Sequence, residues 1–218
     1  EGQTYVMKEI SAPYGYEIAE EITSDGDRHT LIVLGGDGTV NEVINGIVYL
    51  GQTELGYIPL GSSNDLARGL ELPSDPEKAL FSILNAPARP VDIGCVRYGG
   101  RTRRFIVSSG FGFDASVCHQ VMVSRLKPLL NRLHLGKLTY AGVALQLLFF
   151  LRPQNMQMIL DGQEKISFHG VYFAAAMNLP FEGGGFKFCP HADCRDGKLN
   201  IIVVSGLSKL KVLLLLPT

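Results

Sequence analysis

The sequence has few cysteines, almost no excess charge and no long apolar run, and each shortage argues against a class of protein. A formal net charge of −1 over 218 residues provides no overall field to attract nucleic acid. The four cysteines, Cys95, Cys118, Cys189 and Cys194, suit a reduced cytoplasmic protein better than a disulfide scaffold. The longest apolar run, residues 140–151, is shorter than the roughly 20 residues that a membrane-spanning helix needs. We therefore expect a cytoplasmic protein that binds no nucleic acid.

A glycine-rich turn between a predicted strand and a predicted helix is the most informative stretch of the sequence. Residues 31–34 are four consecutive apolar residues, typical of a strand buried on both faces of a parallel sheet. Residues 35–38 (Gly-Gly-Asp-Gly) follow, and Thr39 and Glu42 predict a capping box where a helix starts. This order directs backbone N–H groups and the positive helix end at one point, which favours a phosphate. The predicted buried face of the helix is Val40, Val43, Ile44, Ile47 and Val48.

Asp37 is the one acidic residue inside this turn. Its carboxylate would repel a phosphate unless a cation or a hydroxyl proton lay between them, so we interpret Asp37 as a Mg²⁺-linked or proton-handling group. The alternative is a plain strand-to-helix connection in which Asp37 only forms the turn, because glycine turns before helices are common.

A second polar glycine turn, residues 61–65 (Gly-Ser-Ser-Asn-Asp), follows a predicted strand over residues 55–60. Helical spacing resumes directly after it, at Leu66, Ala67 and Leu70. Ligands of open α/β sheets bind outside the carboxyl ends of the strands. Because the two turns are one strand–helix–strand unit apart, we expect them to line one crevice.

The remaining sequence predicts a change of architecture after residue 88. Before it, a strand is predicted over 4–10, a helix over 14–22, and another helix that Asp75 caps. The buried stripe predicted for this last helix is Ala79, Leu80, Ile83 and Leu84. After residue 88, alternating apolar residues and turns at 99–100 and 161–162 predict antiparallel strands. We also predict a glycine-broken loop over 110–114, helices over 115–125 and 137–151, and a strand over 199–203.

Three polar clusters have two interpretations each. Asp193 and Asp196 could hold a hard cation with backbone oxygens, or could form an ordinary hairpin turn. Cys189, His191 and Cys194 could bind zinc, but a fourth ligand is missing. We therefore favour the interpretation that they belong to a turn in which the thiols have no ligand role.

The third cluster is basic. For Arg101, Arg103 and Arg104 we favour a solvated edge strand over contact with lipid phosphates or with an acidic partner. Residues 124–151 mix basic and apolar side chains, which fits either a membrane surface or a helix packed on the β-rich domain.

The two glycine turns together resemble the diacylglycerol kinase catalytic domain, and most closely the bacterial YegS- and DgkB-like lipid kinases. Residues 35–42 (Gly-Gly-Asp-Gly-Thr-Val-Asn-Glu) and 58–68 (Ile-Pro-Leu-Gly-Ser-Ser-Asn-Asp-Leu-Ala-Arg) carry the resemblance. It implies an α/β, Rossmann-like, open-sheet nucleotide-binding domain over residues 1–88. A mainly antiparallel β-sandwich lipid-substrate domain over residues 89–218 would follow.

The resemblance also implies a reaction in which the γ-phosphoryl group of ATP moves to a lipid hydroxyl, with Asp37 acting through Mg²⁺. Diacylglycerol is the favoured acceptor, and phosphatidic acid would be the product. The expected partners are ATP and a lipid substrate at the membrane surface, and a homodimer is the assembly considered. A structural Mg²⁺ is implied at Asp193, Asp196 and Lys198. The implied nucleotide-binding residues are Gly35, Gly36, Asp37, Gly38, Thr39, Asn41, Glu42, Gly61, Ser62, Asn64 and Asp65.

The sequence departs from the family pattern in two places. Ser62 stands where the family usually has threonine, which keeps the hydroxyl. The bacterial family places its presumed general base in a late Asp-Gly-Glu segment, and the sequence ends at Thr218 before such a segment. We expect the sequence to be incomplete at both ends. An NAD kinase-like enzyme with a soluble acceptor and a non-catalytic nucleotide-binding module stay open as alternatives.

Overall fold

The computed structural model describes residues 14–112, 152–209 and 211–212. Contacts divide the chain into two compact units, Glu1–Ile106 and Val107–Thr218. Among the described residues, no helix has the length and apolar character needed to cross a bilayer.

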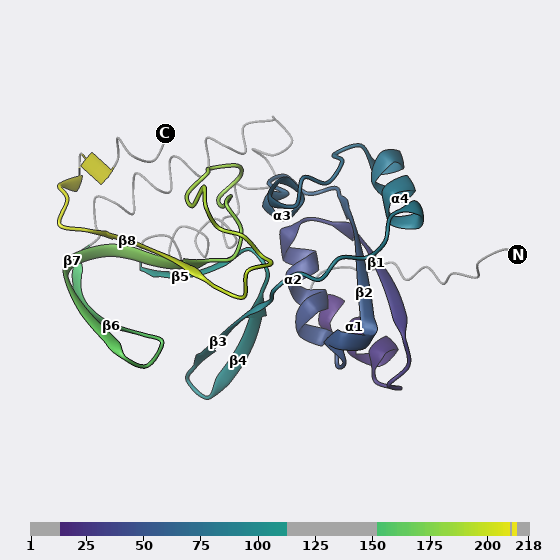
Figure 1. Cartoon of the computed structure of the whole chain (residues 1–218), viewed down its shortest axis with the longest axis horizontal. Helices are drawn as coiled ribbons and strands as arrows, with labels where there is room; N and C mark the ends of the chain where they lie inside the picture. The colour runs from purple at the N-terminus through teal and green to yellow at the C-terminus, as the bar shows by residue number, and fades with distance from the viewer. Residues whose placement is uncertain (1–13, 113–151, 210, 213–218) are drawn as a thin grey trace, which may run out of the picture. The chain divides into compact units, whose positions relative to one another are not determined.

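The first unit contains a parallel pair of strands with helices packed against it (Figure 1). The two strands are paired in register from His29 opposite Thr53 to Gly35 opposite Pro59, so their carboxyl ends coincide. The predicted order of strand, glycine turn and helix is therefore confirmed. The elements of this unit are α1 (Gly15–Thr23), β1 (His29–Gly35), α2 (Asp37–Gly46), η1 (Leu50–Gln52), β2 (Thr53–Pro59), α3 (Asp65–Gly69), α4 (Pro76–Asn85), β3 (Gly94–Tyr98) and β4 (Arg101–Phe105).

Helix α2 packs against β1 and α1 through the apolar face that the sequence predicts. Val40, Val43, Ile44 and Ile47 are buried, as predicted. Val48 lies beyond the end of the helix and is exposed, so its predicted burial is wrong.

The predicted burial of β1 on both faces is also wrong. Val33 is buried, whereas the side chains of Ile32 and Leu34 are 37% and 58% exposed. Successive residues of a strand point to opposite faces, so Ile32 and Leu34 share the face opposite to Val33. Their exposure shows that this face is only partly covered.

Helix α4 begins as predicted, because the Asp75 carboxylate accepts a hydrogen bond from the Lys78 amide at 2.9 Å. Its predicted buried stripe is only partly correct, since Ala79 is buried while Leu80 and Leu84 are exposed. The helix contacts β2, where Ile83 lies beside Gly56, and Ala79 is on the same row as Ile83. Leu80 and Leu84 form the adjacent row, about 100° further around the helix.

The β3–β4 hairpin is held on α2 by Arg104. The guanidinium Nη1 of Arg104 donates to the carbonyl oxygens of Ile44, at 2.8 Å, and Ile47, at 2.6 Å, where α2 ends. The Asn45 side chain bonds the backbone N–H and carbonyl of the same arginine. These contacts place residues 94–105 with the first unit, while the functional boundary between residues 88 and 89 stays a prediction.

The second unit contains an antiparallel sheet in which the long strand β7 pairs with β5, β6 and β8. Its strands are β5 (Ser108–Gly112), β6 (Gln154–Leu160), β7 (Glu164–Met177) and β8 (Asn200–Ser205). The predicted hairpin at 161–162 and the strand near 199–203 are confirmed. Residues 110–112 form part of β5 rather than a loop, because pairing with β7 outweighs the weak strand preference of glycine. The strand predicted over 4–10 and the helices predicted over 115–125 and 137–151 lie outside the described residues.

Candidate functional site

The structure brings the two glycine turns together at the carboxyl ends of β1 and β2. The Leu60 amide donates to the Gly35 carbonyl at 2.7 Å, which continues the strand pairing into the turns. A Cβ atom on Gly61 would lie only 2.5 Å from the Cα of Gly36. The two backbones can touch here because neither residue has a side chain.

The N-terminus of α2 opens directly from this contact. Gly36 is the N-cap residue, and it has no side chain with which to cap the helix. The first N–H groups of a helix have no acceptor within it, so the N-terminus favours an anion. Gly38 is exposed, and a Cβ added there would meet no atom of the described residues within 4 Å. A ligand can therefore approach the main chain closely at this position.

The predicted capping box at the start of α2 is wrong. The helix begins at Asp37, which places Thr39 inside its first turn. The Thr39 side chain instead occupies the space beside Gly35, where an added Cβ would lie 2.8 Å from Thr39 Oγ1. The Glu42 carboxylate accepts a hydrogen bond from the Gly15 amide at 3.3 Å, so it ties α2 to α1.

Asp37 has a structural role that sequence analysis missed. Its Oδ2 accepts a hydrogen bond from the Asp65 amide and its Oδ1 accepts one from the Leu66 amide, both at 3.0 Å. These are the first two residues of α3, whose own N-cap residue, Asn64, forms no side-chain cap. Asp37 therefore caps α3 from the other turn and fixes the two turns relative to each other.

Asn64 shapes the second turn from within. It adopts the left-handed conformation, with φ of 52°, which asparagine tolerates better than most residues. Its Oδ1 accepts hydrogen bonds from the Gly61 amide at 2.9 Å and the Tyr57 hydroxyl at 3.2 Å. Its Nδ2 donates to the Gly61 carbonyl at 2.8 Å. These contacts make Asn64 a scaffold residue of the turn; nucleotide contact by Asn64 stays a prediction.

Two carboxylates influence the ionisation of Tyr57 beneath the turns. Tyr57 is 4% exposed and Asp65 is 5% exposed. Burial raises the pKa of the Tyr57 phenol, and the negative charges of Asp37 and Asp65 raise this pKa further. The phenol is therefore a neutral hydrogen-bond donor to Asn64 at physiological pH.

The raised pKa of Tyr57 predicts a loss of stability in alkaline solution. An unfolded tyrosine ionises near pH 10, while the folded protein still holds the Tyr57 proton. The unfolded state then binds fewer protons than the folded state, so the free energy of unfolding falls as pH rises above about 10. Urea unfolding between pH 8 and about 11 should show a smaller fall for Tyr57→Phe than for the unmodified chain. Equal falls would show that Tyr57 does not cause the effect.

Three other predicted nucleotide-binding residues have different surroundings. The Asn41 Nδ2 donates to the Arg104 carbonyl at 3.2 Å, and Glu42 contacts α1 through Gly15. The contacts of these two side chains thus lie on the hairpin and on α1 rather than on the turns. Ser62 is exposed within the second turn.

The predicted metal residues of the second unit form local turn contacts. The Asp193 carboxylate accepts from the Arg195 amide at 3.1 Å, and the Asp196 carboxylate from the Lys198 amide at 2.9 Å. Within the part of the chain that the structure describes, no three His, Cys, Asp or Glu side chains converge to hold a metal. Mg²⁺ at Asp193, Asp196 and Lys198 stays a prediction.

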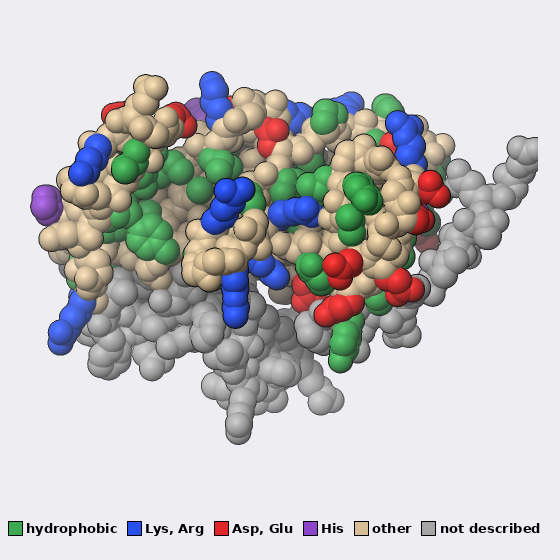
Figure 2. Space-filling view, turned by 90° about the horizontal axis from the view of Figure 1, so that it is seen from below, with side chains coloured by type: hydrophobic (Ala, Val, Ile, Leu, Met, Phe, Trp, Pro, Cys, Tyr) green, Lys and Arg blue, Asp and Glu red, His purple; other side chains and the backbone are tan. Residues whose placement is uncertain are grey.

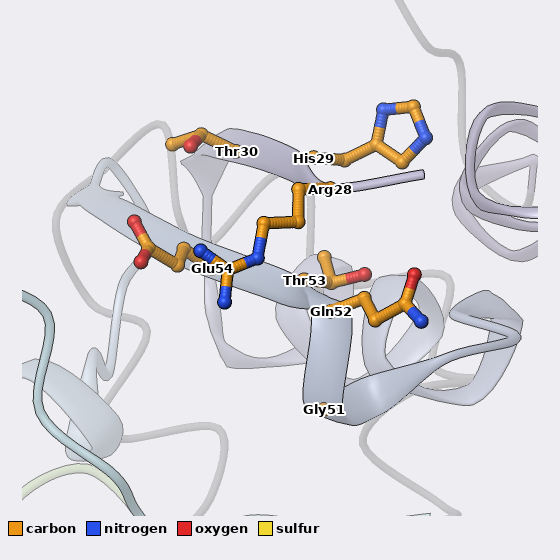
Figure 3. Close-up of a pocket in the computed structure, with 7 residues that line it drawn as sticks. All are labelled: Arg28, His29, Thr30, Gly51, Gln52, Thr53 and Glu54. Atoms are coloured by element: carbon orange, nitrogen blue, oxygen red, sulfur yellow. The ribbon is translucent and has the colours of Figure 1, made fainter. Parts of the chain in front are cut away.

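A shallow hollow of about 240 Å³ lies at the opposite end of the two strands, where β1 and β2 begin. In Figure 3 the Arg28 side chain extends over it toward Glu54, while the His29 ring points away. The lining mixes opposite charges and includes none of the predicted site residues. The lining residues are Arg28, His29, Thr30, Gly51, Gln52, Thr53 and Glu54.

Comparison with known families agrees with this geometry. A family model described as the diacylglycerol kinase catalytic domain matches residues 3–96. A second, described as the YegS C-terminal NAD kinase beta sandwich-like domain, matches residues 106–218. The chain therefore belongs to the diacylglycerol kinase family in which a YegS-type sandwich domain follows the catalytic domain. The resemblance and the fold class predicted from the sequence are confirmed.

Individual relatives come from several bacteria. The diacylglycerol kinase of Bacillus subtilis (strain 168) is 35% identical over 177 residues, which are 80% of this chain and 54% of that protein. The diacylglycerol kinase of Mycobacterium tuberculosis (strain H37Rv) is 32% identical over 194 residues, 86% of this chain and 59% of that protein. A crystal structure of a diacylglycerol kinase from Bacillus anthracis str. Sterne matches with a TM-score of 0.65 and 25% identity, covering 94% of this chain and 63% of that one. The chain thus spans a little over half the length of these relatives.

Proposed function

We propose that this chain forms part of a lipid kinase that transfers the γ-phosphoryl group of ATP to a lipid hydroxyl. The observation that carries the proposal is the N-terminus of α2, where the N-cap residue Gly36 has no side chain to cap the helix and contacts Gly61. The N–H groups of residues 36–39 would bind the phosphates of ATP. The relatives named diacylglycerol kinase favour diacylglycerol as the acceptor and phosphatidic acid as the product.

The residues at the turns fit a nucleotide that is bound with Mg²⁺. Asp37 and the buried Asp65 bring two acidic side chains to the two turns, and the Asp65 amide bonds the Asp37 carboxylate. A carboxylate oxygen that accepts one hydrogen bond keeps a further lone pair, which could bind a metal ion. Mg²⁺ binds readily through one or two carboxylates together with substrate phosphates. We assign Asp37 to this contact, and the ion would neutralise charge that develops on the transferred group.

Positioning is the main contribution of this chain to such a reaction. The two hydrogen bonds from α3 hold the Asp37 carboxylate in place, and Asn64 holds the second turn in place. The phosphate-binding main chain and the acidic group are therefore preorganised by contacts within the first unit.

The test is phosphoryl transfer from radiolabelled ATP in the longest natural form of the protein. Diacylglycerol in neutral detergent micelles and NAD in solution serve as competing acceptors. We expect Mg²⁺-dependent labelling of diacylglycerol and none of NAD. Labelling of NAD alone would support the soluble-acceptor alternative, and ATP binding without any transfer would support the non-catalytic one.

A further inference from the structure

The β3–β4 hairpin carries a concentration of positive charge, although the chain as a whole is nearly neutral. Residues 94–105 contain four arginines and no acidic residue, whereas the whole chain has a net charge of −1. Arg97, Arg101 and Arg103 are exposed. Arg104 is partly buried against α2. Arg97 and Arg101 are therefore presented to solvent, and Arg104 anchors the hairpin. The exposed Arg103 lies between these roles, because its Nη2 also donates to Asn41 Oδ1 on α2 at 3.5 Å.

The pairing of the hairpin places an aromatic ring among these arginines. Tyr98 lies opposite Arg101, and Val96 lies opposite Arg103. Opposite residues of an antiparallel pair lie on the same face, so Tyr98, Arg101 and Arg103 share one face. The Tyr98 side chain is 57% exposed. Arg97 is on the other face, so both faces carry positive charge.

Among the described residues, nothing crowds the tip of the hairpin. A Cβ added to Gly99 or Gly100 would meet no atom of these residues within 4 Å. Figure 2, which views the molecule from the side toward which the hairpin points in Figure 1, shows lysine and arginine side chains gathered over the hairpin. A flat charged surface could therefore contact the tip and the exposed arginines beside it.

We propose that the β3–β4 hairpin docks on the surface of an anionic membrane. Anionic headgroups attract clustered arginines, and tyrosine is favoured at the boundary between headgroups and acyl chains. The alternative is that the charge only prevents the edge of the hairpin from pairing with another strand. Such protection needs charge along the exposed edge alone, and the charge could have either sign. It does not explain why both faces carry only positive charge, with a tyrosine at the tip.

Docking at the hairpin would also orient the candidate site. Arg104 ties the base of the hairpin to the carboxyl end of α2, whose opposite end would hold the phosphates of ATP. A membrane contact at the tip therefore fixes the distance of the α2 N-terminus from the lipid surface. This proposal rests on the proposed function, in which the phosphoryl acceptor is a lipid.

Vesicle sedimentation tests the docking directly. We compare the unmodified chain with Arg97→Gln/Arg101→Gln on phosphatidylcholine vesicles with and without phosphatidylglycerol. The matched control, Lys78→Gln/Lys165→Gln, removes the same charge from exposed positions elsewhere. Each arginine near an anionic surface is worth about a factor of five in binding, so we expect the hairpin variant to bind at least about tenfold more weakly. The control should bind nearly as well as the unmodified chain, and binding should weaken with salt.

A fluorescent probe locates the contact. The sequence has no tryptophan, so Tyr98→Trp introduces a single emitter at the hairpin tip. Its emission should shift to shorter wavelength on vesicles that contain phosphatidylglycerol. Tyr49→Trp, at a position that is 46% exposed outside the hairpin, should not shift.

Three results would overturn the proposal. The first is an equal loss of binding in the hairpin variant and its control, and the second is no binding of the unmodified chain to anionic vesicles. The third is hairpin-dependent binding of single-stranded RNA without vesicle binding, which would assign the arginines to nucleic acid. A failure of phosphoryl transfer in neutral micelles would count against the proposed function alone, because those micelles contain no anionic lipid.

Discussion

Replacing Asp37 by asparagine should reduce phosphoryl transfer by at least about 100-fold, because the charge that would hold Mg²⁺ is lost. The same change should lower the free energy of unfolding by about 1–2 kcal/mol. The asparagine NH₂ group cannot accept a hydrogen bond, so one of the Asp65 and Leu66 amides loses its acceptor. Transfer assays and urea unfolding of the same variant measure the two effects separately.

The matched control is Asp75→Asn. Asp75 caps α4 through one hydrogen bond from the Lys78 amide, which the asparagine Oδ1 can still accept, so the substitution removes the charge of a helix cap and keeps its hydrogen bond. It should destabilise the protein by about 1 kcal/mol or less and leave transfer unchanged. If Asp37→Asn kept full transfer activity at a temperature where it is folded, Asp37 would be a structural cap only.

The glycines of the two turns should differ in how a change to alanine affects stability. A Cβ on Gly38 meets nothing, and alanine favours a helix over glycine by up to about 1 kcal/mol, so Gly38→Ala should not destabilise the fold. The same methyl group would stand where a phosphate approaches α2. We therefore expect the affinity for ATP to fall at least about tenfold, which corresponds to a loss of about 1.4 kcal/mol of binding free energy.

Gly61→Ala should damage both properties. Its Cβ would lie 2.5 Å from the Gly36 Cα and 2.8 Å from Asn64 Oδ1, so the turns would have to separate. Overpacking of this kind costs about 1–3 kcal/mol. Thermal unfolding and calorimetric titration with ATP distinguish the two variants. A Gly38→Ala protein that binds ATP normally would show that the nucleotide does not approach the first turn of α2.

Local patterns in the sequence predicted the elements of the candidate site correctly. The apolar run before Gly35, the helical spacing after Gly38 and the Asp75 cap each depend on residues close in sequence. Turns at 99–100 and 161–162 were predictable for the same reason, since short hairpins depend on their own turn residues.

Contacts between distant segments account for what the sequence did not predict. The Asp37 carboxylate caps α3 from 28 residues away, which no local motif indicates. Burial of β1 and α4 was overestimated because apolar spacing does not say which neighbours cover a face. Strand β5 formed despite its glycines because β7 supplies the pairing partner. The role of Arg104 as an anchor likewise needed the position of α2.

A crystal structure with a non-hydrolysable ATP analogue and Mg²⁺ would show where the phosphates of the nucleotide bind. We expect phosphate oxygens within hydrogen-bonding distance of the main-chain N–H groups of residues 36–39, with the metal at the Asp37 carboxylate. Phosphates bound elsewhere, for example in the hollow beside Arg28, with the N-terminus of α2 empty, would contradict this expectation.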